Sequence, residues 1–223
     1  MKKYFVIVGD VIGSTTAIRD RVSFRDKLLD EVKMVNKVFH EDFLAEMNIT
    51  MGDSISGVLR RVTHVYRIID ALLGAVRPIP IRFAVVYGTI DVGVKSRMSR
   101  LMDGPAFNVA AKHAMPFMRE NKTLFLMLGG DKLIDPLVTS VINAVIMLKS
   151  EWTERQFQAA RLYGQFRNQR EVGRRLKISQ AAVSKMLKAA NIHPVWILEN
   201  DIDQSLGRYQ QRLSQQASYG GTR

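Results

Sequence analysis

Two stretches decide the fold: YFVIVGDVIGST at residues 4–15 and TMGDSISG at residues 50–57. The first is an unbroken apolar run, typical of a buried strand, that ends in Asp10 and a Gly-Ser-Thr turn. The second places Asp53 in a Gly-flanked turn between two short strands. If these strands lie side by side, Asp10 and Asp53 converge at one sheet edge. Two such carboxylates can hold Mg²⁺ and the triphosphate that it carries.

Helices and strands alternate outward from these stretches. Apolar residues recur every three or four positions over residues 23–42 and 62–74, which predicts two amphipathic helices. Further helices are expected at residues 107–118 and 131–149, and strands at residues 4–8, 48–51, 54–59, 79–87 and 123–128, with a hairpin partner at 88–94. This order predicts an α+β fold, an antiparallel-rich sheet with helices on one face.

Composition limits the class of protein. A chain of 223 residues with 47% hydrophobic content fits one medium domain and a small one. The sequence has no cysteine, which excludes disulfides and thiolate metal sites and is compatible with a reducing cytoplasm. The first apolar run stops at Gly9, too early for a signal peptide, and no window approaches the ~20 apolar residues of a membrane span. We expect a soluble, cytoplasmic protein with no membrane partner.

The charge indicates an anionic partner. The formal net charge is +12 and the pI is about 10.1. Residues 153–190 carry nine basic residues and two acids, a local excess of seven in under a fifth of the chain. A solvated helical surface would explain this excess as well as nucleic-acid binding, so charge alone leaves both readings open.

Taken singly, each acid has an ordinary explanation. Asp10 could cap a helix and Asp53 could belong to a hairpin turn. A P-loop is excluded, because that motif needs Lys before its Ser or Thr and Gly13 occupies the position.

Four segments in register carry a resemblance to a known family. They are DVIGST at residues 10–15, MGDS at 51–54, RFAVVYG at 82–88 and GPAFNVAAK at 104–112. Together they resemble the class III nucleotidyl cyclase catalytic domain over roughly residues 3–128. More narrowly, the chain resembles the SatD family, in which a cyclase-like domain precedes a helix-turn-helix. The resemblance implies a ferredoxin-like, palm-type sandwich of the nucleotidyl cyclase kind.

The resemblance also implies site residues. Asp10 and Asp53 match the two metal-binding aspartates, which implies Mg²⁺ or Mn²⁺ and a nucleoside triphosphate as ligand or substrate. The backbone of the phosphate-binding turn matches Val11, Ile12, Gly13 and Ser14. Amides at a helix N-terminus suit such an anion.

On the same basis, Asn108 and Lys112 match the Asn and Arg that stabilise the cyclase transition state, and Arg82 matches a structural strand Arg. The cyclase site forms between two subunits, so the resemblance implies a homodimer. Two departures stand out: Ile49 and Leu101 occupy the positions that read the base, and Lys112 lacks the planar fork of Arg. In the alternative reading, Asn108 only caps its helix and Lys112 is a solvated surface residue.

A second motif lies near the C-terminus. Residues 169–176 and 180–189 form two predicted short helices, with Ser179 as the N-cap of the second. Gly173 is small where crossing helices would touch, and Lys177 stands where such turns often carry Gly. This pattern is the helix-turn-helix found in many bacterial regulators.

The second of these helices is expected to enter the major groove of double-stranded DNA. Its groove-facing residues are Gln180, Ala181, Ser184, Lys185 and Lys188. Gln can read adenine and Ala can touch a thymine methyl, while basic residues meet phosphate. The residues expected to anchor the DNA backbone are Arg167, Arg170 and Arg174. A small helical interaction module without DNA contact is the alternative.

These features predict a cyclase-like domain at residues 1–150, a helix-turn-helix domain at 151–198, opened by a TERQ capping box, and a mobile polar tail at 199–223. We expect a dimeric DNA-binding regulator whose cyclase-like domain senses a metal-bound nucleotide. Two alternatives remain: an active Mg²⁺-dependent nucleotidyl cyclase or nucleotidyltransferase tethered to DNA, and a DNA-binding dimer whose cyclase-like domain is inert.

Overall fold

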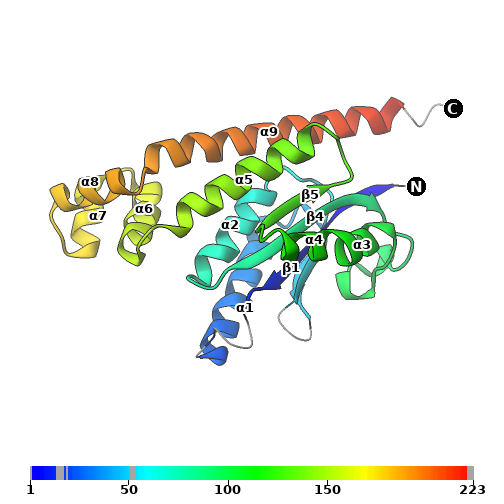
Figure 1. The fold of residues 1–223 in the computed structure, drawn as a ribbon, viewed down its shortest axis with the longest axis horizontal. Coiled ribbons are helices and arrows are strands. Elements are labelled where there is room, and N and C mark those ends of the chain that lie inside the picture. The colour runs from blue at the N-terminus through cyan, green and yellow to red at the C-terminus, as the bar shows by residue number, and fades with distance from the viewer. Residues whose placement is uncertain (1, 14–17, 19, 51–53, 220–223) are drawn as a thin grey trace. The chain divides into compact units, whose positions relative to one another are not determined.

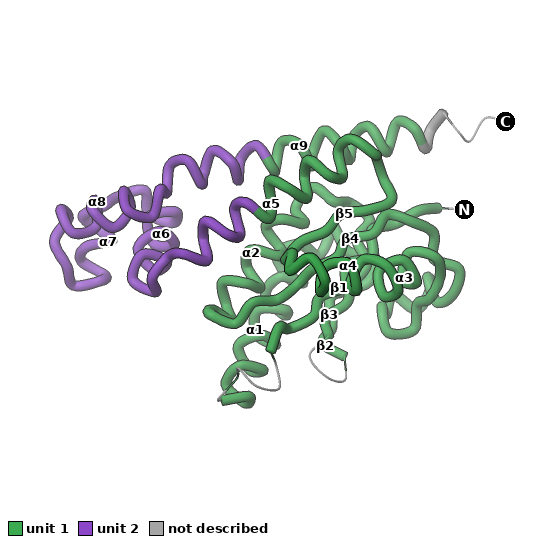
Figure 2. The backbone as a smooth tube through the Cα atoms, viewed as in Figure 1, with its two compact units in different colours: residues 1–143, 202–223 green, residues 144–201 purple. Residues whose placement is uncertain are grey.

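The computed structural model describes residues 2–13, 18, 20–50 and 54–219. The chain divides into two compact units, residues 1–143 with 202–223, and residues 144–201 (Figure 2). The first unit holds the sheet and the second is helical.

The sheet of the first unit has five strands in the order β2-β3-β1-β4-β5. β1 is central and pairs antiparallel with β3 and β4, whereas β5 joins β4 in parallel, so the sheet is mixed. The strands are β1 (Lys3–Val11), β2 (Phe43–Ile49), β3 (Ser54–Leu59), β4 (Ile81–Thr89) and β5 (Phe125–Leu128).

The helices of this unit include α1 (Arg21–Val38), α2 (Val65–Ala75), α3 (Pro105–Val109), the π-helical turn η3 (Ala110–Ala114), α4 (Met115–Glu120) and the start of α5 (Ile134–Ser150). Figure 1 labels the α-helices. No helix in the described part of the chain is both long and apolar enough to span a bilayer.

The expected hairpin strand at residues 88–94 is wrong. β4 continues through Gly88 and Thr89, and beyond it only an isolated bridge joins Val92 to Asp103. Gly93 turns the chain away with φ +79°, where a Cβ would lie 1.9 Å from the carbonyl oxygen of Leu101. The chain then forms two 3₁₀ turns, η1 (Val94–Ser96) and η2 (Ser99–Leu101).

Helices cover both faces of the sheet, not one as expected. Val6 and Val86 pack in a cluster with Ala110 and Met118 of the α3–α4 segment. Phe5, one residue before Val6, points to the other face, where its ring meets Tyr209 from the C-terminal helix. Figure 1 shows α1, α2 and α5 on that side.

The open edge of β5 is covered by α5. Asn143 accepts hydrogen bonds from the amides of Leu124 and Phe125, both at 3.0 Å, and donates to the carbonyl of Phe125 at 2.7 Å. Thr139 accepts from the amide of Met127 at 3.0 Å. These side chains satisfy backbone groups that an edge strand otherwise leaves unpaired.

The first predicted helix, over residues 23–42, was drawn too long, because α1 ends at Val38 and residues 39–42 form the turn to β2. The amide of Phe39 caps α1 by donating to the carbonyl of Val35. Asn36 then fixes the next strand, donating to the carbonyl of Met47 and accepting from its amide, both at 2.9 Å.

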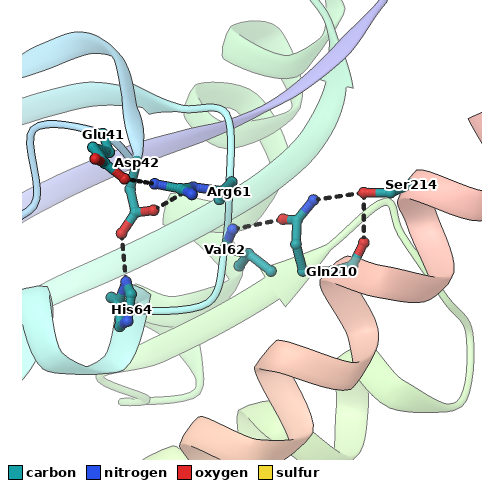
Figure 3. A network of polar contacts seen from close by, with 7 residues as sticks. All are labelled: Glu41, Asp42, Arg61, Val62, His64, Gln210 and Ser214. Atoms are coloured by element: carbon teal, nitrogen blue, oxygen red, sulfur yellow. Dashed lines mark hydrogen bonds and ion pairs between the residues drawn. The ribbon is translucent and has the colours of Figure 1, made fainter.

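The expected mobile tail is also wrong over the residues that the structure describes. α9 (Ile192–Tyr219) is one helix, and its residues Ile202, Leu206, Tyr209 and Leu213 are buried at helical spacing. Gln210 accepts a hydrogen bond from the amide of Val62 at 2.9 Å (Figure 3). This part of α9 therefore belongs to the first unit, and residues 220–223 lie outside the described range.

In the second unit α6 (Glu154–Phe166), α7 (Gln169–Leu176) and α8 (Gln180–Ala189) pack around buried Val172, Val183 and Leu187. The predicted capping box is confirmed: Thr153 accepts from the amide of Gln156 at 3.2 Å and its own amide donates to the Gln156 side chain at 2.8 Å. The predicted bounds of α7 and α8 are confirmed as well.

Candidate functional site

Asp10 lies at the end of β1, opposite Ser54 of β3 and Arg82 of β4. One of its carboxylate oxygens, Oδ2, accepts from Arg82 at 3.2 Å and from Arg119 of α4 at 3.0 Å. Both Asp10 and Arg82 are largely buried, while Arg119 is exposed. The end of β1 thus holds one carboxylate between two guanidinium groups.

The structure describes the turn after Asp10 only as far as Gly13, so its role as a phosphate cradle stays a prediction. Val11 is buried within β1, and the amide of Ile12 donates to the carbonyl of Pro80 at 2.9 Å. Gly13 follows with φ +71°. Because α1 begins only at Arg21, these amides do not lie at its N-terminus. Ile12 is therefore already hydrogen-bonded, and Ser14 lies outside the described residues.

Asp53, the second expected metal ligand, also lies outside the described residues, so its approach to Asp10 stays a prediction. Among the residues that the structure covers, no three His, Asp or Glu side chains gather as a metal site. Asp10 beside two guanidinium groups does not fit a bare divalent cation, because like charges repel. A carboxylate still has further lone pairs, so Asp10 can join a site that Asp53 and phosphate oxygens complete.

Asn108 and Lys112 are both exposed, on α3 and η3. The Asn108 side chain donates to the carbonyl of Gly104 at 3.1 Å, a bond within its own helix; the N-cap of α3 is Gly104, so Asn108 is not the cap of the alternative reading.

Asn108 lies far from Asp10 within one chain. α3 begins beside Gly88, where an added Cβ would lie 3.2 Å from the Cβ of Ala106, and Gly88 pairs with Tyr4. Asp10 lies six residue steps along β1 from Tyr4, or roughly 20 Å at ~3.3 Å per residue. One chain therefore does not bring Asn108 and Asp10 to a common ligand atom.

Of the expected base-reading positions, Ile49 lies two strands from the residue before Asp10, because it pairs with Ile55 and Ile55 pairs with Gly9. Ile49 ends β2 and lines a cavity of about 1060 Å³ along the outer edge of that strand, together with Arg97 and Arg100. Leu101 is 53% exposed at the end of η2. Neither offers a hydrogen bond to a base from its side chain.

The connection between α7 and α8 has the predicted local geometry. Lys177 adopts φ +55°, and the amide of Ile178 donates to the carbonyl of Gly173 at 2.9 Å. A Cβ at Gly173 would lie 2.7 Å from the carbonyl oxygen of Ile178, so the turn needs the small residue there. Ser179 caps α8 by accepting from the amide of Ala182 at 3.1 Å.

The residues expected to contact DNA lie mostly at the surface of this unit. Ser184 is half-buried and the other seven are exposed: Arg167, Arg170, Arg174, Gln180, Ala181, Lys185 and Lys188. Because Val183 and Leu187 are buried, α8 turns its apolar residues inward and its basic residues outward.

Two of the arginines expected to contact DNA, Arg174 and Arg167, already have partners. Arg174 and Arg175 both bond to Glu171, at 2.9 and 2.7 Å, and these hydrogen bonds, from Arg174 first, lower the pKa of Glu171 to about 2. The Arg167 guanidinium lies 4.0 Å from the centre of the Trp196 ring, which itself stacks on Tyr163. Arg167 is thus held against an aromatic pair.

Sequence reasoning missed Arg119 at Asp10 and Trp196 at Arg167. Arg119 lies 109 residues from Asp10, and no local motif links the two. Trp196 lies near the end of the predicted helix-turn-helix domain. Only the periodicity of α9 could have indicated that its ring faces α6.

A mixed five-stranded sheet followed by a helical C-terminal region defines a mixed α/β protein. The chain belongs to the SatD family, whose model matches residues 4–203. No curated protein matches it.

Among solved structures, a bacterial light-regulated adenylyl cyclase is similar at 13% identity and a TM-score of 0.36, over 56% of this chain and 74% of that one. A regulator of polyketide synthase expression from Bifidobacterium adolescentis is similar at 11% identity and a TM-score of 0.22, over 92% of this chain and 86% of that one.

Proposed function

We propose that this protein is a dimeric DNA-binding regulator whose sheet-containing unit binds a metal-bound nucleotide. The observation that supports DNA binding best is the α7–α8 pair. Two short helices meet at a tight turn against Gly173, and the second presents exposed Gln180, Ala181, Lys185 and Lys188. A helix-turn-helix uses such a second helix to enter the major groove.

The ion pairs of this unit refine the proposal. Arg170, Lys185 and Lys188 contact phosphate, whereas Arg174 shares the charge of Glu171 and contributes less. Gln180 and Ala181, in the first turn of α8, lie where recognition helices contact base edges.

The DNA half is tested by fluorescence anisotropy with a labelled double-stranded DNA at low salt. Lys185→Glu should weaken binding at least tenfold, since it replaces a phosphate contact by repulsion. Lys27→Glu, an exposed position on α1 in the other unit, is the control with the same charge change. Equal losses in both variants, or binding by neither variant nor wild type, would contradict the proposal.

The nucleotide half is supported by the cluster at the end of β1. Arg82 and Arg119 give this edge two cations that suit a triphosphate, and Asp10 supplies a carboxylate for the accompanying metal. A metal-bound nucleotide would exchange the Arg–Asp10 pairs for Arg–phosphate and Asp10–metal contacts. We therefore expect Mg²⁺ alone to bind poorly and Mg²⁺ with nucleoside triphosphate to bind well.

Thermal shift with Mg²⁺, triphosphate and both together tests this expectation. Asp10→Asn should remove the stabilisation by the pair, and DNA affinity should change with nucleotide in wild type only. A protein whose DNA affinity is the same with and without nucleotide is not such a sensor.

The homodimer is proposed from the separation of Asn108 and Asp10. A second copy could bring its Asn108 and Lys112 to the Asp10 end of the first. Light scattering measures the dimer directly. Mixing Asp10→Asn chains with Asn108→Ala chains should then restore part of the nucleotide binding that each variant lacks alone.

A further inference from the structure

A second cavity lies in the first unit, at the opposite end of β1 from Asp10. It has a volume of about 820 Å³, which is within the range of small-molecule sites. Its walls come from the start of β1, the residues after β3, Tyr87 of β4 and the last turns of α9. We call it the basic cavity.

The charge lining the basic cavity has one sign. Four of its residues are basic, Lys2, Lys3, Arg60 and Arg61, and none of the lining residues is acidic. A concave surface lined by cations concentrates the field and attracts anions.

Arg61 is already neutralised. It bonds to Asp42, which is 2% exposed, at 2.7 Å and to Glu41 at 3.0 Å, and its hydrogen bond lowers the pKa of Glu41 (Figure 3). His64 contacts the other oxygen of Asp42 at 2.6 Å. Arg61 thus holds the wall in place and leaves the remaining cations for a ligand.

Those remaining cations, Lys2, Lys3 and Arg60, form no ion pair with any residue in the described part of the chain. The Lys3 ammonium instead lies 5.6 Å from the centre of the Tyr87 ring, and that of Lys2 the same distance from Tyr4. A cation–π contact is weaker than a charged hydrogen bond to phosphate, so a phosphate ligand can recruit both lysines.

Most of the remaining lining is apolar or already hydrogen-bonded. The Tyr87 ring lies 4.5 Å from that of buried Phe5, and burial raises the pKa of its hydroxyl, which keeps it neutral. Gln210 accepts from Val62 and donates to Ser214 at 3.3 Å (Figure 3). The cavity thus combines free cations with an aromatic surface and carries no carboxylate that would repel an anion or hold a metal.

We propose that the basic cavity binds a small polyphosphate ligand without a metal ion, its phosphates contacting Lys3 and Arg60 and any ring resting on Tyr87. This site is distinct from the nucleotide site proposed at Asp10, where a carboxylate and a metal take part. A ligand here would also contact α9, since Gln210 and Ser214 form one wall.

The test uses the full chain and inorganic tripolyphosphate, with EDTA present to remove divalent ions, in isothermal titration calorimetry. Lys3→Glu and Arg60→Gln should each weaken binding at least tenfold. Lys27→Glu, the exposed α1 control, should leave it unchanged, and EDTA keeps the metal-dependent site proposed at the end of β1 from contributing. Circular dichroism melting confirms that each variant folds.

Two further arms identify the ligand. The first arm compares a metal-free nucleoside triphosphate with tripolyphosphate. Tighter binding of the nucleotide supports a ligand with a ring, provided that Tyr87→Ala lowers the nucleotide affinity only to that of tripolyphosphate. Equal affinities support the polyphosphate alone. Wild-type affinity in Lys3→Glu and Arg60→Gln, or a loss as large in Lys27→Glu, would overturn the proposal. So would a double-stranded DNA that binds through Lys3 while tripolyphosphate does not.

Discussion

One buried hydrogen bond helps to hold residues 202–219 of α9 within the first unit. The Tyr209 hydroxyl, in a side chain 1% exposed, donates to Asp135 at 2.9 Å, and the other Asp135 oxygen accepts from the amide of Gly130 at 2.9 Å. Tyr209→Phe keeps the ring and removes this bond to a buried carboxylate. A hydrogen bond to a charged group contributes about 1.5–3 kcal/mol. The melting temperature should therefore fall by about 3–12 °C, at ~2–4 °C per kcal/mol for a chain of this size.

The same contact predicts that the stability of the protein decreases at alkaline pH. Burial first, and then the charge of Asp135, raises the pKa of Tyr209 above its ordinary value of 10.0. The folded state therefore keeps the proton that the unfolded chain loses, and this contribution is complete below pH 10 and declines as the pH rises further. Each pH unit above 10 should remove about 1.4 kcal/mol from the wild type through this group, and nothing in Tyr209→Phe.

Melting followed by circular dichroism at pH 7, 10 and 11 measures both effects. Tyr4→Phe is the matched control, since the described residues accept no hydrogen bond from its hydroxyl. Two results would refute the role given to this bond. One is a Tyr209→Phe melting temperature within 1 °C of wild type at pH 7. The other is an equal loss of stability between pH 10 and pH 11 in wild type and in Tyr209→Phe.

Three further predictions concern the helical unit and the Asp10 site. Gly173→Ala should lower the stability of residues 144–201 by about 1–3 kcal/mol, because the added Cβ would meet the carbonyl oxygen of Ile178. Hydrogen exchange of the α7 amides measures this loss. Unchanged protection of those amides would contradict the prediction. Glu171→Gln should strengthen DNA binding several-fold by releasing Arg174 and Arg175. In wild type the Glu171 carboxyl should titrate near 2 by NMR, so its contribution to stability should decline as the pH falls from 4.5 and end near pH 2. Wild type should release no pyrophosphate from nucleoside triphosphates. If wild type does release it and Asp53→Asn does not, the protein is instead an active nucleotidyl cyclase or nucleotidyltransferase.

Local patterns predicted much of the fold. The helices α7 and α8 and the capping box of α6 depend on residues within a few positions of one another, and their predictions were correct. The strands over residues 54–59 and 79–87 were located for the same reason, since short apolar runs bounded by Gly or Pro decide them.

Errors arose where long-range contacts decide the structure. Nothing near residue 125 indicates that β5 runs parallel to β4, an arrangement that requires the long α3–α4 connection. Residues 199–219 were judged by polar composition, although Ile202, Leu206, Tyr209 and Leu213 carry a helical period. At the site, the chain from Asp10 to Arg119 spans most of the first unit, so only the fold brings that pair together.

The central claim is that α8 carries the DNA contacts, and the salt dependence of DNA affinity tests it most directly. Each phosphate neutralised contributes about 0.9 to the slope of log K against log salt. The double variant Lys185→Gln, Lys188→Gln should therefore lower the slope by about 1.8, while Lys27→Gln leaves it at the wild-type value. An unchanged slope in the double variant, or no measurable DNA binding by wild type at 50 mM salt, would contradict the account.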